Sequence, residues 1–274
     1  MKGIVSFFLV LFVMPLGHAA MIIVERYYEA YMPLAAVGLT LVGIAIIIAT
    51  RKFDDDGVQS FWGALGGVLV WTGSVEYSFI FAMQRFSIPD SPSVGGEYML
   101  LEYSLGLLIP LLFYILFQES IRCSPVLWLR KKFNLMRGSV ATGRIDNYGP
   151  RTAFEMFAVL WFFYVMMMLA YDIGVASWAT YLEFALCLGG GIYTAYQLYQ
   201  KKTWGTAIRY AIPTVIIVWT NVELISKWGF FEEPWIALNV PFMISVVVAF
   251  AIMVYLVTDN LREKKNENSA QKAE

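Results

Sequence analysis

Long apolar stretches, separated by short polar and charged ones, dominate the pattern of this chain. Seven of these stretches have the length of about 20 residues that an α-helix needs to cross the hydrocarbon core of a bilayer. The pattern therefore predicts an all-α, polytopic transmembrane helix bundle with seven spans. The predicted spans are residues 31–50, 59–83, 99–117, 154–172, 177–199, 205–224 and 235–257.

A further apolar stretch at the N-terminus has the layout of a secretory signal. Residues 1–20 begin with Lys2, continue through a short apolar core, and then reach the helix breaker Pro15 and two alanines. Charged start, apolar core and small residues at the end are the features of a cleaved signal peptide. We expect cleavage ahead of Met21, which leaves residues 21–258 as a single transmembrane domain.

His18, close to this predicted cleavage point, is the only histidine of the chain. It is an unusual residue at such a point, and apolar residues resume at 21–24, so an uncleaved first span, with eight spans in total, is the alternative. A single imidazole nearly excludes histidine-ligated haem, histidine-rich di-iron sites and most zinc enzymes. Cys123 and Cys187 lie in different segments without metal-ligand spacing and are predicted to be free thiols. We expect no metal and no cofactor.

The composition supports a membrane protein. Of the 274 residues, 59% are hydrophobic and 15% are charged, and the mean hydropathy is +0.61. A soluble globule of this composition would expose far too much apolar surface. The net charge of -1 gives no sign of a nucleic-acid partner. The expected surroundings are therefore a lipid bilayer, and the sequence names no protein partner.

Basic residues fix the predicted orientation. The longest loop, residues 118–153, carries seven lysines and arginines, and it is cytoplasmic by the positive-inside rule. Alternation of seven spans then places Arg51-Lys52, Lys201-Lys202 and the charged tail on the same side. We expect an inner (plasma) membrane protein with the mature N-terminus outside and the C-terminus inside. Residues 259–274 are predicted to be a disordered cytoplasmic tail.

Five carboxylates lie within the outer halves of these spans or at their outer ends. Glu76 stands out, because an acid inside a span costs roughly 2 to 3 kcal/mol and therefore usually faces the protein interior and often carries function. Glu183 is as deep as Glu76, each about two helical turns from the boundary. The shallower acids have ordinary explanations: Glu102 and Asp172 can reach headgroups and water. Glu223 can pair with a lysine four residues on, Lys227.

Aromatic and polar side chains accompany the acids. If these faces of the helices converge, they form an aromatic-walled cavity in the outer half of the membrane. We predict Glu76 as the principal acid and Glu183 and Glu223 as catalytic helpers. The predicted substrate-binding residues are Trp71, Tyr77, Glu102, Trp219 and Asn221. A buried neutral carboxyl can act as a general acid, and aromatic faces stabilise the cation that forms.

Two stretches resemble a known family. Arg51-Lys52-Phe53-Asp54-Asp55, followed by a span with Ala64-Leu65 and the segment 71–76, resembles the first two spans of the integral membrane terpene cyclases of fungal meroterpenoid pathways. The stretch 203–210, TWGTAIRY, is similar to a later span of that family. The resemblance implies a seven-helix membrane enzyme with acidic catalysts. In that family the key acid directly follows a tryptophan, and a second acid lies in the last span. Here four residues separate Trp71 from Glu76, and residues 236–257 contain no acid.

Three functions fit these observations. The first is an acid-catalysed cyclase or isomerase that acts on an apolar isoprenoid or lipid. The second is a proton-coupled transporter that uses intramembrane glutamates. The third is an accessory subunit of a membrane complex. No nucleotide-binding or nucleophile-elbow motif suggests another reaction.

The sequence also contains a short internal echo. Trp71-Thr72 precedes Glu76, and Trp219-Thr220 precedes Glu223. If the N-terminal stretch is a span, four spans separate the copies, which corresponds to a parallel repeat. The spacings differ between the copies, so chance explains the echo equally well.

Overall fold

The computed structural model describes residues 2–88, 96–118, 124–135 and 147–231, together with residues 244, 247–248, 251–252 and 254–255. Within these ranges the chain is helical and contains no strand, which confirms the all-α class. Most of the predicted seventh span, the tail 259–274 and Cys123 lie outside the described residues.

Four helical stretches in the described part of the chain are long and apolar enough to cross a membrane. Leu105–Phe117 is apolar but shorter. The structure therefore agrees with a helical protein of membrane type, whereas the count of seven spans stays a prediction. The four stretches are Lys2–Lys52, Asp56–Phe86, Tyr148–Ile173 and Trp204–Lys227.

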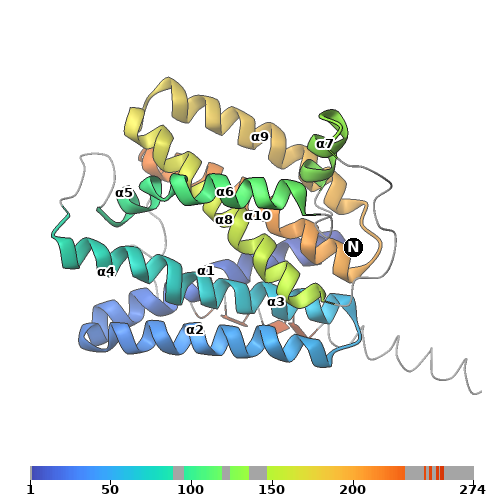
Figure 1. Cartoon of the computed structure of the whole chain (residues 1–274), viewed down its shortest axis with the longest axis horizontal. Helices are drawn as coiled ribbons and strands as arrows, with labels where there is room; N and C mark the ends of the chain where they lie inside the picture. Colours follow the sequence, from blue (N-terminus) through green and yellow to red (C-terminus); the bar gives the residue numbers. More distant parts are fainter. Residues whose placement is uncertain are drawn as a thin grey trace, which may run out of the picture.

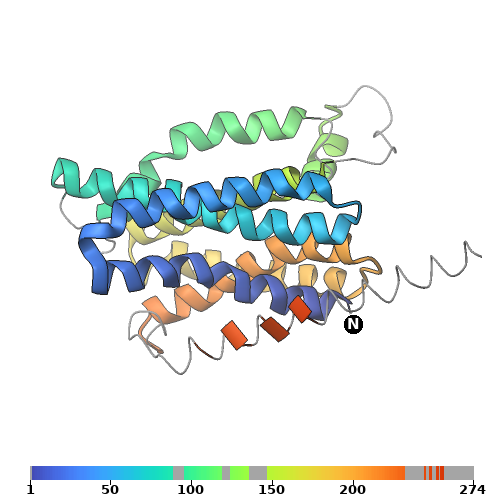
Figure 2. The same cartoon turned by 90° about the horizontal axis from the view of Figure 1, so that it is seen from below.

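The first of these stretches is two helices. It folds back at the single turn η1 (Glu29–Tyr31), so that α1 and α2 form a hairpin, as Figure 2 shows. In Figure 1, α2 and α9 lie at opposite edges of the bundle, with α1, α3, α8 and α10 between them. The helices are α1 (Lys2–Tyr28), α2 (Met32–Ala49), α3 (Asp56–Val70), α4 (Tyr77–Phe86), α5 (Gly96–Tyr103), α6 (Leu105–Phe117), α7 (Ser124–Lys132), α8 (Tyr148–Ile173), α9 (Trp178–Tyr199) and α10 (Trp204–Lys227); η2 (Thr50–Lys52) ends α2, and η3 (Trp71–Glu76) joins α3 to α4.

The N-terminal helix α1 is part of the main core. Leu9, Val10 and Val13 are each 1% exposed, and they share one apolar cluster with residues of α3, α8 and α10. Ile208 and Ile212 represent α10 in this cluster. The predicted signal segment 1–20 therefore packs one face of its helix into the core of the bundle in the full chain.

Polar residues at the starts of α3 and α10 fix where these helices begin. The Asp55 carboxylate accepts hydrogen bonds from the backbone N–H groups of Gly57 and Val58. The Thr203 hydroxyl accepts one from the N–H of Thr206. Such N-caps satisfy N–H groups that have no partner inside the helix.

Candidate functional site

Glu76 binds the only histidine of the chain. Its Oε1 lies 2.5 Å from Nδ1 of His18, and the two side chains are 28% and 38% exposed, respectively. The predicted principal acid is therefore part of a carboxylate–imidazole pair between η3 and α1. Such a pair can hold a proton and pass it on, because a carboxyl group and an imidazole can each bind and release a proton.

A π-helical turn, η3, carries this acid. Its six residues, Trp71–Glu76, interrupt the long helix between α3 and α4. In a π turn the backbone bonds run from i to i+5, and such turns occur frequently at functional sites. Trp71, Thr72 and Gly73 are buried here, so the turn lies inside the bundle.

Close packing brings α1 and η3 together at the pair. A Cβ atom added at Gly17, the residue before His18, would lie 2.5 Å from Oγ1 of Thr72. On the other side of the turn, a Cβ atom at Gly73 would lie 2.5 Å from the Ala36 carbonyl oxygen of α2. Two glycines therefore let the α1–α2 hairpin approach the turn that presents Glu76.

Aromatic rings lie close to this turn. The Trp71 ring stacks on Tyr164 of α8, with centroids 6.4 Å apart and planes at 12°. Tyr77, directly after Glu76, packs against the cluster of Met21 and Met32. Trp71 and Tyr77, both predicted as wall residues, thus flank the acid along the chain.

Glu223 lies on α10 with an aromatic partner of its own. Its Oε1 accepts a hydrogen bond from the indole Nε1 of Trp219 at 2.6 Å. The Lys227 ammonium, expected beside Glu223, lies over the ring of Tyr171 at 6.0 Å from the centroid. Glu223 and Trp219, predicted separately as helper and wall, are thus joined directly.

The other predicted acids lie on different helices. Both carboxylate oxygens of Glu183 on α9 are buried, and neither has a hydrogen-bond partner among the described residues. With its amide oriented to satisfy both ends, Asn221 of α10 donates to the Phe184 carbonyl at 3.0 Å and accepts from the Leu188 N–H at 3.2 Å. Asn221 therefore binds the backbone of α9 next to Glu183. Glu102 is on α5, which packs against α4 and α8.

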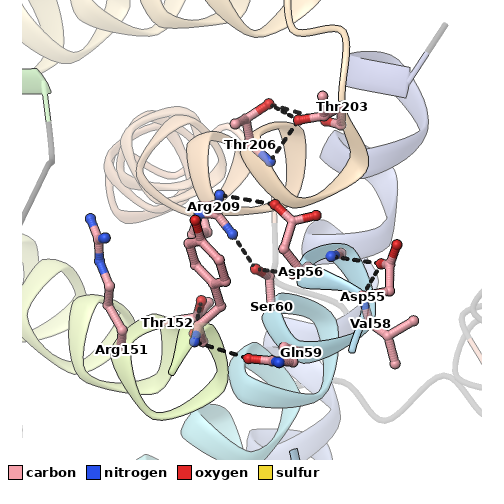
Figure 3. A network of polar contacts seen from close by, with 12 residues as sticks. Asp55, Asp56, Val58, Gln59, Ser60, Arg151, Thr152, Thr203, Thr206 and Arg209 are labelled. Atoms are coloured by element: carbon pink, nitrogen blue, oxygen red, sulfur yellow. Dashed lines mark hydrogen bonds and ion pairs between the residues drawn. The ribbon is translucent and has the colours of Figure 1, made fainter. Parts of the chain in front are cut away.

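A second polar cluster lies at the opposite ends of the helices, where α3 and α10 begin (Figure 3). Arg209 of α10 donates to the Ser60 hydroxyl at 2.6 Å and to the Asp56 carboxylate at 3.4 Å. Its guanidinium lies 4.2 Å from the ring centroid of Tyr148. Gln59 receives the N–H of Tyr148 at 3.0 Å, which ties α8 to the same cluster. Arg209 holds three helices together where the two stretches of the terpene-cyclase resemblance meet.

The sequence singles out Glu76 but not its partner. His18 is the only imidazole of the chain and lies in the apolar N-terminal stretch, and this combination is the signal that points to it. Nothing in the sequence marks Tyr164 or Arg209, since each contacts residues that are far from it along the chain. Convergence of all the acids on one cavity stays a prediction.

Comparison of the chain with protein-family models, curated proteins and solved structures found no match. The resemblance to membrane terpene cyclases therefore rests on the quoted residues alone.

Proposed function

We propose that this protein is an integral membrane acid catalyst that cyclises or isomerises an apolar isoprenoid or lipid, with Glu76 as the proton donor. The observation that carries the proposal is the 2.5 Å contact between Glu76 and His18. It gives a membrane carboxyl group a titratable partner, which a purely structural acid does not need.

The contact leaves one carboxyl oxygen for chemistry. His18 occupies Oε1, so a proton on Oε2 can pass to an alkene carbon or an epoxide oxygen. In the alkene case the π electrons form the new C–H bond and leave a carbocation; the epoxide instead opens its C–O bond. An N–H of His18 stabilises the resulting carboxylate at Oε1. A second double bond of the substrate then attacks the cation and closes a ring. The ring cation finally loses a proton to the Glu76 carboxylate, which regenerates the acid.

The aromatic residues beside Glu76 fit the same chemistry. Trp71 stacks on Tyr164, and Tyr77 follows the acid directly. The face of an aromatic ring attracts a cation, and the attraction strengthens when water is excluded. Glu183 and Glu223 serve in this proposal as further acids or as the final base.

The proposal requires that α1 remains in the mature protein, because His18 lies within residues 1–20. The burial of Leu9, Val10 and Val13 supports this alternative to cleavage. Retention of α1 makes eight spans, and the N-terminus is then expected on the cytoplasmic side instead of outside. Lys2 lies over the Trp204 ring at 5.7 Å, at the end of the bundle that the positive-inside rule assigns to the cytoplasm. Both termini are then cytoplasmic in the plasma membrane.

The experiment compares lipid extracts from cells with and without the gene, and then from cells with variants. Glu76→Gln keeps the shape of the side chain but removes its proton, so the isoprenoid product should disappear while the amount of membrane-inserted protein stays unchanged. Glu25→Gln, an exposed acid on α1, is the matched control and should keep the product. A product that persists in the Glu76→Gln variant would overturn the proposal.

Proton-coupled transport is the second candidate, favoured by the π turn itself. A span interrupted beside an intramembrane acid is the kind of helix from which transporters build a binding site. For this function the lipid extract stays unchanged, and solute uptake driven by a pH gradient is lost in the Glu76→Gln variant. If neither lipids nor uptake respond to the gene, the remaining function is that of an accessory subunit.

A further inference from the structure

We infer that the chain consists of two like membrane units related by a pseudo-two-fold axis along the helices, and that Trp219–Glu223 is the counterpart of Trp71–Glu76 in a site shared by both units. The first unit contains α1, α2 and α3, and the second contains α8, α9 and α10. Contacts that recur at equivalent positions of the two units support the inference.

The helix starts match first. Asp55 caps α3 and Thr203 caps α10, and in each case a tryptophan follows sixteen positions later, Trp71 and Trp219. Counted from the caps, the two tryptophans of the echo thus occupy the same position. In this register, residue numbers of the two units differ by 148.

Glycines two positions after each cap make reciprocal contacts. A Cβ atom added at Gly57 of α3 would lie 2.8 Å from Cβ of Trp204 on α10. A Cβ atom added at Gly205 of α10 would overlap the carboxylate of Asp56 on α3. Each glycine meets the residue just after the other helix's cap. This is the arrangement that a two-fold axis between two parallel helices produces.

The outer helices repeat the relation with the same difference of 148. A Cβ atom at Gly43 of α2 would lie 2.7 Å from Cγ2 of Val70 on α3. A Cβ atom at Gly191 of α9 would lie 3.3 Å from Cγ2 of Val218 on α10. The two outer helices, α2 and α9, lie at opposite edges of the bundle in Figure 1.

The first helices of the units exchange partners across the axis. α1 packs on α10, and α8 packs on α3. Near its start, α1 brings Gly3 against the backbone of Leu198, and α8 brings Gly149 against Thr50. Leu198 and Thr50 again differ by 148 positions. Gly3 and Gly149 align α1 with α8 at a difference of 146, which also pairs the fully buried Ser6 with Thr152.

The π turn explains the one difference in length between the matching stretches of α3–η3 and α10. The first unit reads VWTGSVE over residues 70–76, whereas the second reads VWTNVE over residues 218–223, one residue shorter. A π turn accommodates one additional residue and lets the regular helix continue beyond it. Glu76, five positions after Trp71, therefore occupies the place of Glu223, four positions after Trp219.

The alignment also places His18. Its equivalent on α8 is Tyr164, which stacks on Trp71. The same symmetry places His18 beside Trp219. The one imidazole thus lies next to Glu76 of the first unit and Trp219 of the second. The shared site presents two carboxylates and two indoles to a single ligand. These groups bind a cation in apolar surroundings, and for the proposed function that cation is the reacting carbocation, so this ligand assignment rests on the proposed function.

Single-residue deletions test the duplication, with folded yield from membranes and thermal stability in detergent as readouts. Deleting Ser74 should convert the π turn into the α-helix of the second unit and leave both values near those of the parent protein. Deleting Val222, at the same level of α10, removes a residue that the helix cannot spare and should lower the yield severalfold. Equal damage by both deletions would overturn the duplication.

Cross-linking of introduced cysteines with a short bis-maleimide reagent tests the shared site separately, in a background with Cys123→Ser and Cys187→Ser. The pair Trp71→Cys with Tyr164→Cys is the positive control, since these side chains face each other with ring centroids 6.4 Å apart. The pair His18→Cys with Trp219→Cys should cross-link with similar efficiency. A reactive control pair with an inert second pair would overturn the shared site. Neither readout needs enzymatic activity, so failure of the proposed function is distinguishable from failure of this inference.

Discussion

At the scale of single residues, two polar pairs that join distant parts of the chain differ in their chemistry. His18 and Glu76 meet within the bundle, near Trp71. Arg209 and Asp56 meet where α3 and α10 begin. The first pair contains two titratable groups and suits proton exchange. The second contains a guanidinium, which stays protonated throughout the physiological range and therefore suits a structural role.

Arg209 gives a prediction at this scale. The Arg209→Gln variant loses the hydrogen bond to Ser60 and the charge interaction with Asp56, and we expect a loss of about 2 kcal/mol of stability. The measurement is thermal unfolding of the purified protein in detergent. Lys202→Gln changes an exposed cation close by and should leave the unfolding temperature unchanged. An equal response of the two variants would contradict the structural role.

The sequence predicts a single residue best when the evidence for it lies in neighbouring residues of the chain. The apolar context of Glu76 marks it without knowledge of any partner. Its pairing with His18 joins residues 58 positions apart, and the pairing of Arg209 with Asp56 joins residues 153 positions apart. Such pairs depend on how helices pack, which the apolar pattern of one helix does not specify.

At the scale of helices, the apolar pattern predicted where helices exist better than where they end. The predicted span 177–199 nearly coincides with α9 (Trp178–Tyr199), although α9 is not among the four stretches that are long and apolar enough to cross a membrane. The predicted span 154–172 is shorter than α8 (Tyr148–Ile173). The polar residues at the start of α8 belong to the helix, but hydropathy alone does not count them. The Tyr148 N–H at this start donates to the side chain of Gln59 on α3, a contact between helices that hydropathy does not register.

The helix α1 gives a prediction at this scale. Leucine at Gly17 would collide with Thr72, and overpacking of this kind costs about 1–3 kcal/mol. We therefore expect Gly17→Leu to lower the unfolding temperature of the purified protein. The matched control is Gly106→Leu on α6, since a Cβ atom at Gly106 meets nothing within 4 Å. Intact mass should show residues 1–20 in the purified chain; their absence would restore the signal-peptide interpretation.

At the scale of the whole molecule, the positions of the chain ends distinguish the two topologies. A cleaved signal leaves the mature N-terminus outside, whereas a retained α1 places Lys2 beside Trp204, at the end of the bundle that we predict to be cytoplasmic. We expect a fluorescent protein fused ahead of Lys2 to fluoresce, because a retained α1 leaves this end of the chain in the cytoplasm. A phosphatase fused after Gly174, in the turn between α8 and α9, should be active outside. Phosphatase activity from an N-terminal fusion would contradict the retained helix.

The short turn between α1 and α2 affects how the protein is made. Because the N-terminal part of a chain is synthesised first, this hairpin can enter the membrane before the helix that carries Glu76 leaves the ribosome. An acid that enters lipid alone costs roughly 2 to 3 kcal/mol. With α1 retained, as we propose, the imidazole of His18 enters the membrane ahead of Glu76 and offsets part of that cost. The order of the two residues along the chain thus prepares the insertion of the acidic span.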